Sequence, residues 1–229
     1  MLRVAFVSDI HSNLEALDSV LGELRGEEVV CLGDVVGYGS NPNEVIETLR
    51  ETGARTVLGN HDSAVLTGDT SMFNARAAMA ARWTEAQLTP ESKEFLKALP
   101  KEIRVDFGGV RTYLTHGSPD DNLWEYVDPS THLDLFGHYL SKLGVRLIGF
   151  GHTHVPYVWS GENGTVFNPG SVGQPRDMDR RASFAVATFD RGSVDVEQRR
   201  VEYDYKGAAE KIVKAGLPAS LAQRLSLGI

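Results

Sequence analysis

The first 58 residues alternate between short apolar runs and amphipathic stretches, and this order constrains the fold more than any other feature. The runs at 3–7, 28–32 and 55–58 have the length and composition of buried strands. Between them, residues 13–25 and 42–51 place apolar side chains at helical spacing, and Pro42 suits a first helical turn. The β-α-β-α-β order predicts a mostly parallel sheet covered by helices.

The rest of the chain continues without a visible boundary. Residues 72–99 predict two helices interrupted near Pro90, and residues 133–143 predict a short third one. No Pro/Gly/Ser-rich linker and no internal repeat divides the sequence, so we predict one domain over residues 1–229. Strands are expected at 103–107, 110–115, 146–149, 157–160, 166–168, 184–189 and 194–201, and terminal helices at 206–215 and 219–225.

Charge and cysteine content narrow the class of protein. The net charge is −8 and no block of Lys or Arg is present, which argues against binding of duplex nucleic acid. Cys31 is the single cysteine and lies in an apolar run, so we expect a buried free thiol. Asp9 interrupts the N-terminal apolar stretch too early for a signal peptide, and no run approaches the ~18 apolar residues of a membrane span. We therefore expect a cytoplasmic protein without a membrane partner; a homo-oligomer stays open.

Polar side chains follow five of the predicted strands, usually beside glycine. Taken singly, such residues are turn formers or helix caps. Together they include five of the seven histidines, and the carboxyl ends of parallel strands are where ligand sites form in α/β sheets. Histidine nitrogens and carboxylate oxygens suit first-row transition metals. The residues are too many for one ion, so we expect two ions sharing a carboxylate: Asp9, His11, Asp34, Asn60, His61, His116, His152 and His154.

Five segments of the chain resemble, in order, the five signatures of the calcineurin-like metallophosphoesterases. They are Asp9-Ile10-His11, Gly33-Asp34, Gly59-Asn60-His61-Asp62, His116-Gly117 and Gly151-His152-Thr153-His154. The resemblance implies an α/β fold, a four-layer α/β/β/α sandwich of two mixed sheets flanked by helices, with two divalent metal ions. One ion would bind Asp9, His11, Asp34 and His154, and the other Asp34, Asn60, His116 and His152.

The same resemblance implies roles for the two residues that follow Asn60. His61 would act as general acid or phosphate contact, with Asp62 orienting it. A hydroxide that bridges the two ions would attack phosphorus in line, and the ions would neutralise the charge that develops.

The substrate is less constrained than the chemistry. Gly37 and Tyr38 stand where the protein Ser/Thr phosphatases of this superfamily have Asp and Arg, which weakens that interpretation. The sequence resembles instead a small prokaryotic branch that includes phosphodiesterases, many of which prefer Mn or Ni. We predict a Mn-dependent phosphodiesterase for small phosphodiesters such as cyclic or other nucleotides, with Fe, Co or Zn as further candidate metals. The alternatives are a phosphomonoesterase, a dinucleotide polyphosphate hydrolase and, less favoured, a non-catalytic binding scaffold.

Four further side chains have two interpretations each. Arg176 is predicted to grip a phosphate oxygen, although a surface ion pair is equally compatible. Asn13 is predicted to line the substrate pocket, although a helix cap accounts for it as well. Trp124 and Tyr126 would form an aromatic wall for a nucleobase or pack a loop, and packing is the more common role of such residues.

Overall fold

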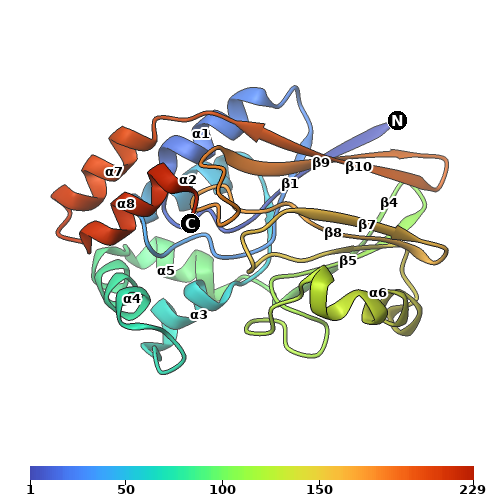
Figure 1. Cartoon of the computed structure of the whole chain (residues 1–229), viewed down its shortest axis with the longest axis horizontal. Coiled ribbons are helices and arrows are strands. Elements are labelled where there is room, and N and C mark those ends of the chain that lie inside the picture. Colours follow the sequence, from blue (N-terminus) through green and yellow to red (C-terminus); the bar gives the residue numbers. More distant parts are fainter.

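The computed structural model describes residues 1–229, apart from the side chain of residue 131, and consists of two β-sheets between helices (Figure 1). The first sheet has the strand order β10-β9-β1-β2-β3. The pairs β1–β2 and β2–β3 are parallel, as the alternating sequence predicts, and β9 and β10 add antiparallel strands from the C-terminal part of the chain. The strands are β1 (Leu2–Val7), β2 (Glu28–Cys31), β3 (Arg55–Thr56), β9 (Ala182–Asp190) and β10 (Ser193–Val201).

The second sheet has the order β4-β5-β6-β8-β7 and is also mixed. The pairs β5–β6 and β6–β8 are parallel, whereas β4–β5 and β7–β8 are antiparallel hairpins. The strands are β4 (Glu102–Phe107), β5 (Val110–Thr115), β6 (Leu147–Gly149), β7 (Tyr157–Gly161) and β8 (Gly164–Asn168).

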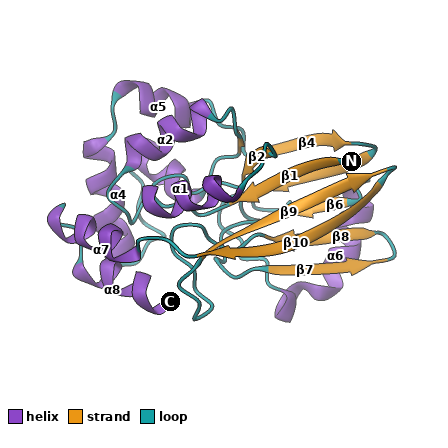
Figure 2. Ribbon diagram, turned by 90° about the horizontal axis from the view of Figure 1, so that it is seen from above, coloured by secondary structure: helices purple, strands orange, loops and turns teal.

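Helices pack against both sheets, and Figure 2, seen from above, shows that most of them gather beside one end of the strands. A first hydrophobic cluster joins the first sheet to most of the helices, and a second joins the second sheet to α6 (Pro129–Leu143). A third lies between the sheets, so the predicted four-layer α/β/β/α architecture is confirmed. The helices on the first sheet are α1 (Leu14–Glu23), α2 (Pro42–Glu51), α3 (Asn60–Thr67), α4 (Ala75–Gln87), α5 (Pro90–Lys97), α7 (Tyr205–Lys214) and α8 (Ala219–Leu227).

The β1 strand shows why the predicted strands are continuously apolar instead of alternating between apolar and polar residues. Val4 and Phe6 face the second sheet, while Ala5 and Val7 face the helices. Successive side chains of a strand point to opposite faces, and a strand buried on both faces needs apolar residues at every position. Between the sheets, the ring of Phe6 packs edge to face on Phe167 at a centroid distance of 4.9 Å.

The structure contains one helix that the sequence did not predict, and another helix begins earlier than expected. We did not predict α3, which begins directly after Gly59 and ends before Gly68, a left-handed cap with φ 73°. The α6 helix starts at Pro129 rather than at residue 133, because Asp128 caps it by accepting from the backbone N–H of Ser130 at 2.7 Å. Across the described residues, no helix combines the length and apolar character that spanning a membrane requires.

Candidate metal centre

The polar residues that we predicted to converge do lie together, beyond the carboxyl ends of strands in both sheets. Asp9 and His11 follow β1, Asp34 follows β2, and Asn60 begins α3 shortly after β3. The parallel strands β5 and β6 of the other sheet deliver the remaining three histidines to the same edge. Every one of the seven is buried: Asp9, His11, Asp34, Asn60, His116, His152 and His154.

Two groups of potential ligand atoms share one carboxylate. Within each group the atoms all lie within 4.8 Å of one another, and Asp34 belongs to both. Asn60 joins the second group through its Oδ1, which is 3.0 Å from Nε2 of His116. The first group is Asp9, His11, Asp34 and His154, and the second is Asp34, His116 and His152.

Each of the four histidines has one ring nitrogen within hydrogen-bond distance of a backbone carbonyl. A carbonyl only accepts, so the neutral ring donates its N–H there and presents the lone pair of its other nitrogen. That is the state in which an imidazole binds a metal ion. The pairs are His11 Nδ1 with Val36 O at 3.2 Å, His116 Nδ1 with Leu32 O at 2.7 Å, His152 Nε2 with Trp124 O at 3.1 Å, and His154 Nδ1 with Gln174 O at 2.5 Å.

The Asp9 carboxylate is only half satisfied by the protein. Its Oδ2 accepts from the Ser8 hydroxyl at 2.6 Å and from the backbone N–H of His152 at 3.0 Å. Its Oδ1 is buried without a hydrogen-bond partner among the described residues. A buried carboxylate oxygen without a partner is costly, and a cation removes that cost. The donor set therefore fits divalent metal ions.

The backbone is strained at the positions that turn side chains into the centre. Asp9, His11, Asp34, His152 and His154 have φ angles of 52°, 50°, 51°, 68° and 61°. Residues other than glycine adopt this left-handed region rarely, and such strain concentrates at functional sites. These sharp turns explain how His152 and His154, two residues apart, both reach the same centre.

Gly59 permits the close approach of two of the loops. A Cβ at this position would lie 2.1 Å from both the backbone N and Oδ1 of Asp34. Only glycine leaves that space free, so the start of α3 can lie directly against the shared carboxylate. The backbone N–H of His61 then donates to Oδ1 of Asp34 at 2.8 Å.

Burial and neighbouring charges shift the pKa values of the histidines in the site. Burial alone would lower the pKa of His116, but the carboxylates of Asp34 and Asp9 raise it to about 9. Burial lowers the pKa of His61 to about 4 and that of His152 to about 3, so both rings are neutral at pH 7. Without a metal ion, an imidazolium at His116 partly balances the two carboxylates, in the place where a cation would bind.

The structure does not show the contact that we expected between Asp62 and His61. The Asp62 carboxylate accepts instead from the backbone N–H groups of Val35, Val36 and Gly59, at 3.2, 3.0 and 3.0 Å. It therefore closes the first turn of α3 and ties it to the loop after β2. Nδ1 of His61 is buried and has no hydrogen-bond partner in the described part of the chain.

Of the two residues predicted to contact substrate, Asn13 and Arg176, only Arg176 lines the cavity beside the candidate ligands. Asn13 is the N-cap of α1: its Oδ1 accepts from the backbone N–H of Ala16 at 3.2 Å, and its amide donates to the Gly173 carbonyl at 2.9 Å. These bonds show the helix cap, and Asn13 is not among the residues that line the cavity beside the candidate ligands; its predicted role in substrate binding stays a prediction. Arg176 lines the cavity beside the candidate ligands, and its Nε is buried without a hydrogen-bond partner among the described residues.

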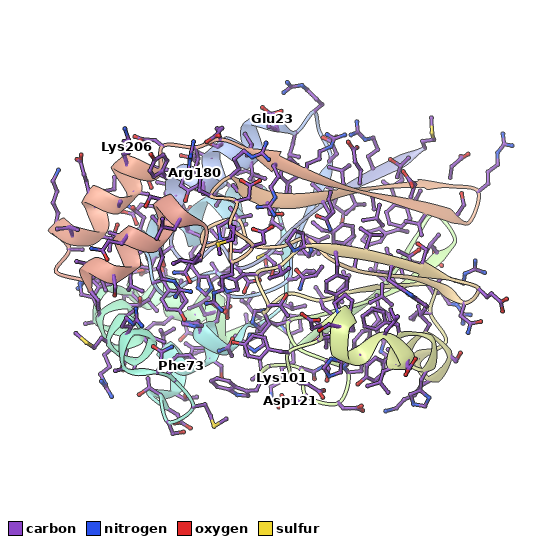
Figure 3. The ribbon with its side chains drawn as sticks, in the orientation of Figure 1. Glu23, Phe73, Lys101, Asp121, Arg180 and Lys206 are labelled. Carbon is purple, nitrogen blue, oxygen red and sulfur yellow. The ribbon has the colours of Figure 1, made fainter. Side chains whose placement is uncertain are left out.

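That cavity has a volume of about 190 Å³ and opens next to His61 and His152. Trp124 and Tyr126 line it, and so do Tyr38 and Phe73, which we did not predict from the sequence. Figure 3 labels Phe73 on the segment between α3 and α4, on the same side of the molecule as Asp121 of the β5–α6 connection. No sequence signal marked Phe73, since an aromatic residue just before a helix is ordinarily part of its packing.

Known proteins are similar to this chain over most of its length. The family model for the calcineurin-like phosphoesterase superfamily domain matches residues 2–192. An uncharacterized protein of Methanocaldococcus jannaschii is 41% identical over 98% of this chain and 98% of its own length. Phosphodiesterase YfcE of Escherichia coli is 27% identical over 77% of this chain and 82% of its own.

Solved structures share the architecture over the whole chain. A metallophosphoesterase from Sphaerobacter thermophilus superimposes with a TM-score of 0.83 at 35% identity, covering 100% of this chain and 99% of that one. A hypothetical protein from Pyrococcus horikoshii superimposes with a TM-score of 0.90 at 22% identity over the same shares, which shows the fold alone.

Proposed function

The chain belongs to the calcineurin-like phosphoesterase superfamily, and on that premise we propose that it is a metal-dependent phosphodiesterase acting on small phosphodiesters, nucleotides among them. The observation that carries the proposal is the Asp34 carboxylate, which belongs to both groups of ligand atoms. A shared carboxylate is what two neighbouring divalent ions need, and paired ions are suited to displacement at phosphorus.

The ligand assignment follows the two groups and their histidine orientations. Asp9, His11, Asp34 and His154 would hold one ion; the other would be held by Asp34, Asn60, His116 and His152. The nitrogen and oxygen donors suit Mn, with Ni, Fe, Co and Zn as further candidates. Such ions would supply Lewis acidity, which would polarise the phosphoryl oxygens and favour loss of a proton from the attacking water near neutral pH.

His61 is the residue of this chain that we assign to the leaving group. Its ring lines the cavity at 4.8 Å from the ring of His11 between centroids, and its Nδ1 has no partner among the described side chains. The pKa of about 4 means that the ring is neutral before substrate binds. A bound phosphoryl anion raises that pKa, and the protonated ring then donates to the leaving oxygen, a contribution of typically 10²- to 10⁴-fold.

Asp62 and Arg176 have different roles around His61 and the metal ligands. Asp62 is a positioning residue: it fixes the start of α3, and thereby Asn60 and His61, against the loop that carries Asp34. Arg176 is the only Lys or Arg among the described residues that line the cavity. Its guanidinium can donate hydrogen bonds to a phosphoryl oxygen of the substrate.

Paired substrates test the proposal. The protein is stripped with a chelator, reloaded with Mn, and assayed on bis-p-nitrophenyl phosphate and p-nitrophenyl phosphate. We expect the diester to be the better substrate. Much faster turnover of the monoester would replace the proposal by a phosphomonoesterase, and inactivity of metal-loaded protein on mono-, di- and pyrophosphate esters would favour a binding scaffold.

Three substitutions test the assigned roles. His61→Ala is expected to keep the metal content and lower turnover, whereas Asp34→Asn is expected to deplete both ions, measured by mass spectrometry. His138→Ala, on α6 and outside the site, is the matched control and should change neither quantity. Equal loss of metal from the first two variants would contradict the division of roles between Asp34 and His61.

A further inference from the structure

Two histidines of the site each carry an aromatic ring on one face. The ring of Tyr126 stacks on His152 at a centroid distance of 4.0 Å and an interplanar angle of 14°. The ring of Phe73 stacks on His61 at 4.4 Å and 27°. Trp124 meets Phe73 at 5.4 Å, so the rings border the cavity from the α3–α4 connection across to the β5–α6 connection.

Core packing does not account for the two rings of the β5–α6 connection. Tyr126 is 52% exposed, and neither Tyr126 nor Trp124 belongs to the three hydrophobic clusters of the described residues. Phe73, in contrast, packs partly against the cluster under the helices. An aromatic ring that lies half in solvent beside a reactive site contributes little to the core, and its exposed surface is available for contact with a ligand.

The backbone holds these rings in place without a ligand. The carbonyl of Trp124 accepts from His152 at 3.1 Å, and its N–H donates to Oδ1 of Asp121 at 3.1 Å. The same connection is closed at its start, where the backbone N–H groups of Gly117 and Ser118 donate to carbonyls at 2.7 and 2.8 Å. A preorganised loop loses little entropy when a flat ligand group stacks on it.

The cavity therefore offers a guanidinium at Arg176 and aromatic side chains among its remaining lining residues. We propose that Trp124, Tyr126 and Phe73 form a subsite for a planar aromatic ring, attached to the phosphoryl group through the ester that is not cleaved. This inference rests on the proposed phosphodiesterase function and deepens it. A nucleobase and an aryl ester share the chemistry that the subsite recognises, because each presents a flat π-face for stacking.

Three diesters that share the same leaving group can show whether the subsite binds a nucleobase or an aryl ester. Thymidine 5′-(p-nitrophenyl phosphate), bis-p-nitrophenyl phosphate and methyl p-nitrophenyl phosphate all release p-nitrophenol, and they differ only in the retained group. In the wild type, kcat/KM should be higher for a ring-bearing diester than for the methyl diester. Preference for the thymidine compound identifies a base, and preference for the bis-aryl compound alone identifies an aryl ester; either supports the subsite.

The substitutions Tyr126→Leu and Trp124→Leu should lower the ratio of kcat/KM between the preferred ring-bearing diester and the methyl diester. Stacking of one base on one aromatic side chain corresponds to a change of about 5- to 150-fold. Tyr126→Phe keeps the ring and should keep the ratio, as should Tyr205→Leu on α7, which lies outside the cavity lining. A ratio that is unchanged in both leucine variants would overturn the inference.

Equilibrium binding separates a failure of the subsite from a failure of the proposed activity. Thymidine 5′-monophosphate should bind more tightly than deoxyribose 5-phosphate, and Tyr126→Leu should remove most of that difference. If none of the diesters is hydrolysed but this difference is present, the phosphodiesterase proposal fails and the subsite stands. Equal affinities for these two phosphates in the wild type would exclude a base. Equal affinities both for this pair and for phenyl phosphate against methyl phosphate would overturn the subsite, whatever the activity.

Discussion

The substitution Gly59→Ala tests whether the close approach of α3 to Asp34 holds the metal centre together. The added Cβ would lie 2.1 Å from the backbone N and Oδ1 of Asp34 and 2.8 Å from its Cα. Two of these three atoms are backbone atoms, so no flexible side-chain end can move out of the way. The φ of Gly59 is −96°, which alanine adopts without strain, so the effect is purely steric.

The expected cost follows from two contributions. Overpacking of a rigid site costs about 1–3 kcal/mol. Displacement of Asp34 also breaks the 2.8 Å hydrogen bond from the His61 N–H, and hydrogen bonds to charged groups contribute about 1.5–3 kcal/mol. We expect the free energy of unfolding to fall by roughly 2.5 to 6 kcal/mol. The affinity for Mn should fall at both sites, because Asp34 serves both.

Urea denaturation of the metal-free protein and metal analysis of the loaded protein measure the two effects. Gly22→Ala is the matched control, since a Cβ at Gly22 meets nothing within 4 Å and the residue lies in α1. That change should raise the free energy of unfolding by about 0.5–1 kcal/mol, because alanine is the better helix former. A Gly59→Ala protein with wild-type stability and full metal content would refute the steric argument.

Two further predictions concern pH. The pKa of about 9 at His116 means that a metal ion must displace a proton from this ring. The affinity for Mn should therefore weaken about tenfold for each unit by which the pH falls between 8 and 6. Calorimetry at several pH values measures this affinity, and an affinity that does not change with pH would contradict the prediction. The pKa of His61 is depressed to about 4, so its stabilising contribution is complete above the unfolded value of 6.5 and is lost as pH falls from 6.5 to 4. Over that pH range, protonation of His61 should lower the free energy of unfolding of the metal-free protein by roughly 3 kcal/mol. Urea titrations of the His61→Gln variant should show a correspondingly smaller decrease. An equal decrease in the wild type and the variant would contradict this pKa assignment.

The strands and the convergence of polar residues were predictable because both depend on local pattern. A run such as Val4–Val7 is apolar at every position because each face of β1 packs on a different layer, and the polar residues after it begin at the strand end. The helix after Gly59 was missed because Asn60, His61 and Asp62 were interpreted as site residues in a loop after the strand. Asp62 three residues after Gly59 was a capping signal that would have found it.

Other features were beyond the sequence for a physical reason. Whether Asp62 turns to His61 or to the backbone depends on where the loop after β2 passes, which is a tertiary fact. Similarly, the sequence did not decide whether Asn13 caps a helix or lines the substrate pocket, because its contact with Gly173 depends on the tertiary structure. The place of Phe73 beside His61 requires α3 and α4 to meet at an angle that no local pattern encodes.

The oxygens that orient the four histidines all belong to the main chain, at Leu32, Val36, Trp124 and Gln174. A peptide oxygen persists when its side chain is exchanged, provided that the local path of the chain is kept. Descendants of this protein, or engineered versions of it, can therefore vary the apolar groups at Leu32 and Val36 while the imidazoles keep their tautomers. By the same reasoning, insertions and deletions near these positions are far more damaging than replacements, because they shift the oxygens themselves.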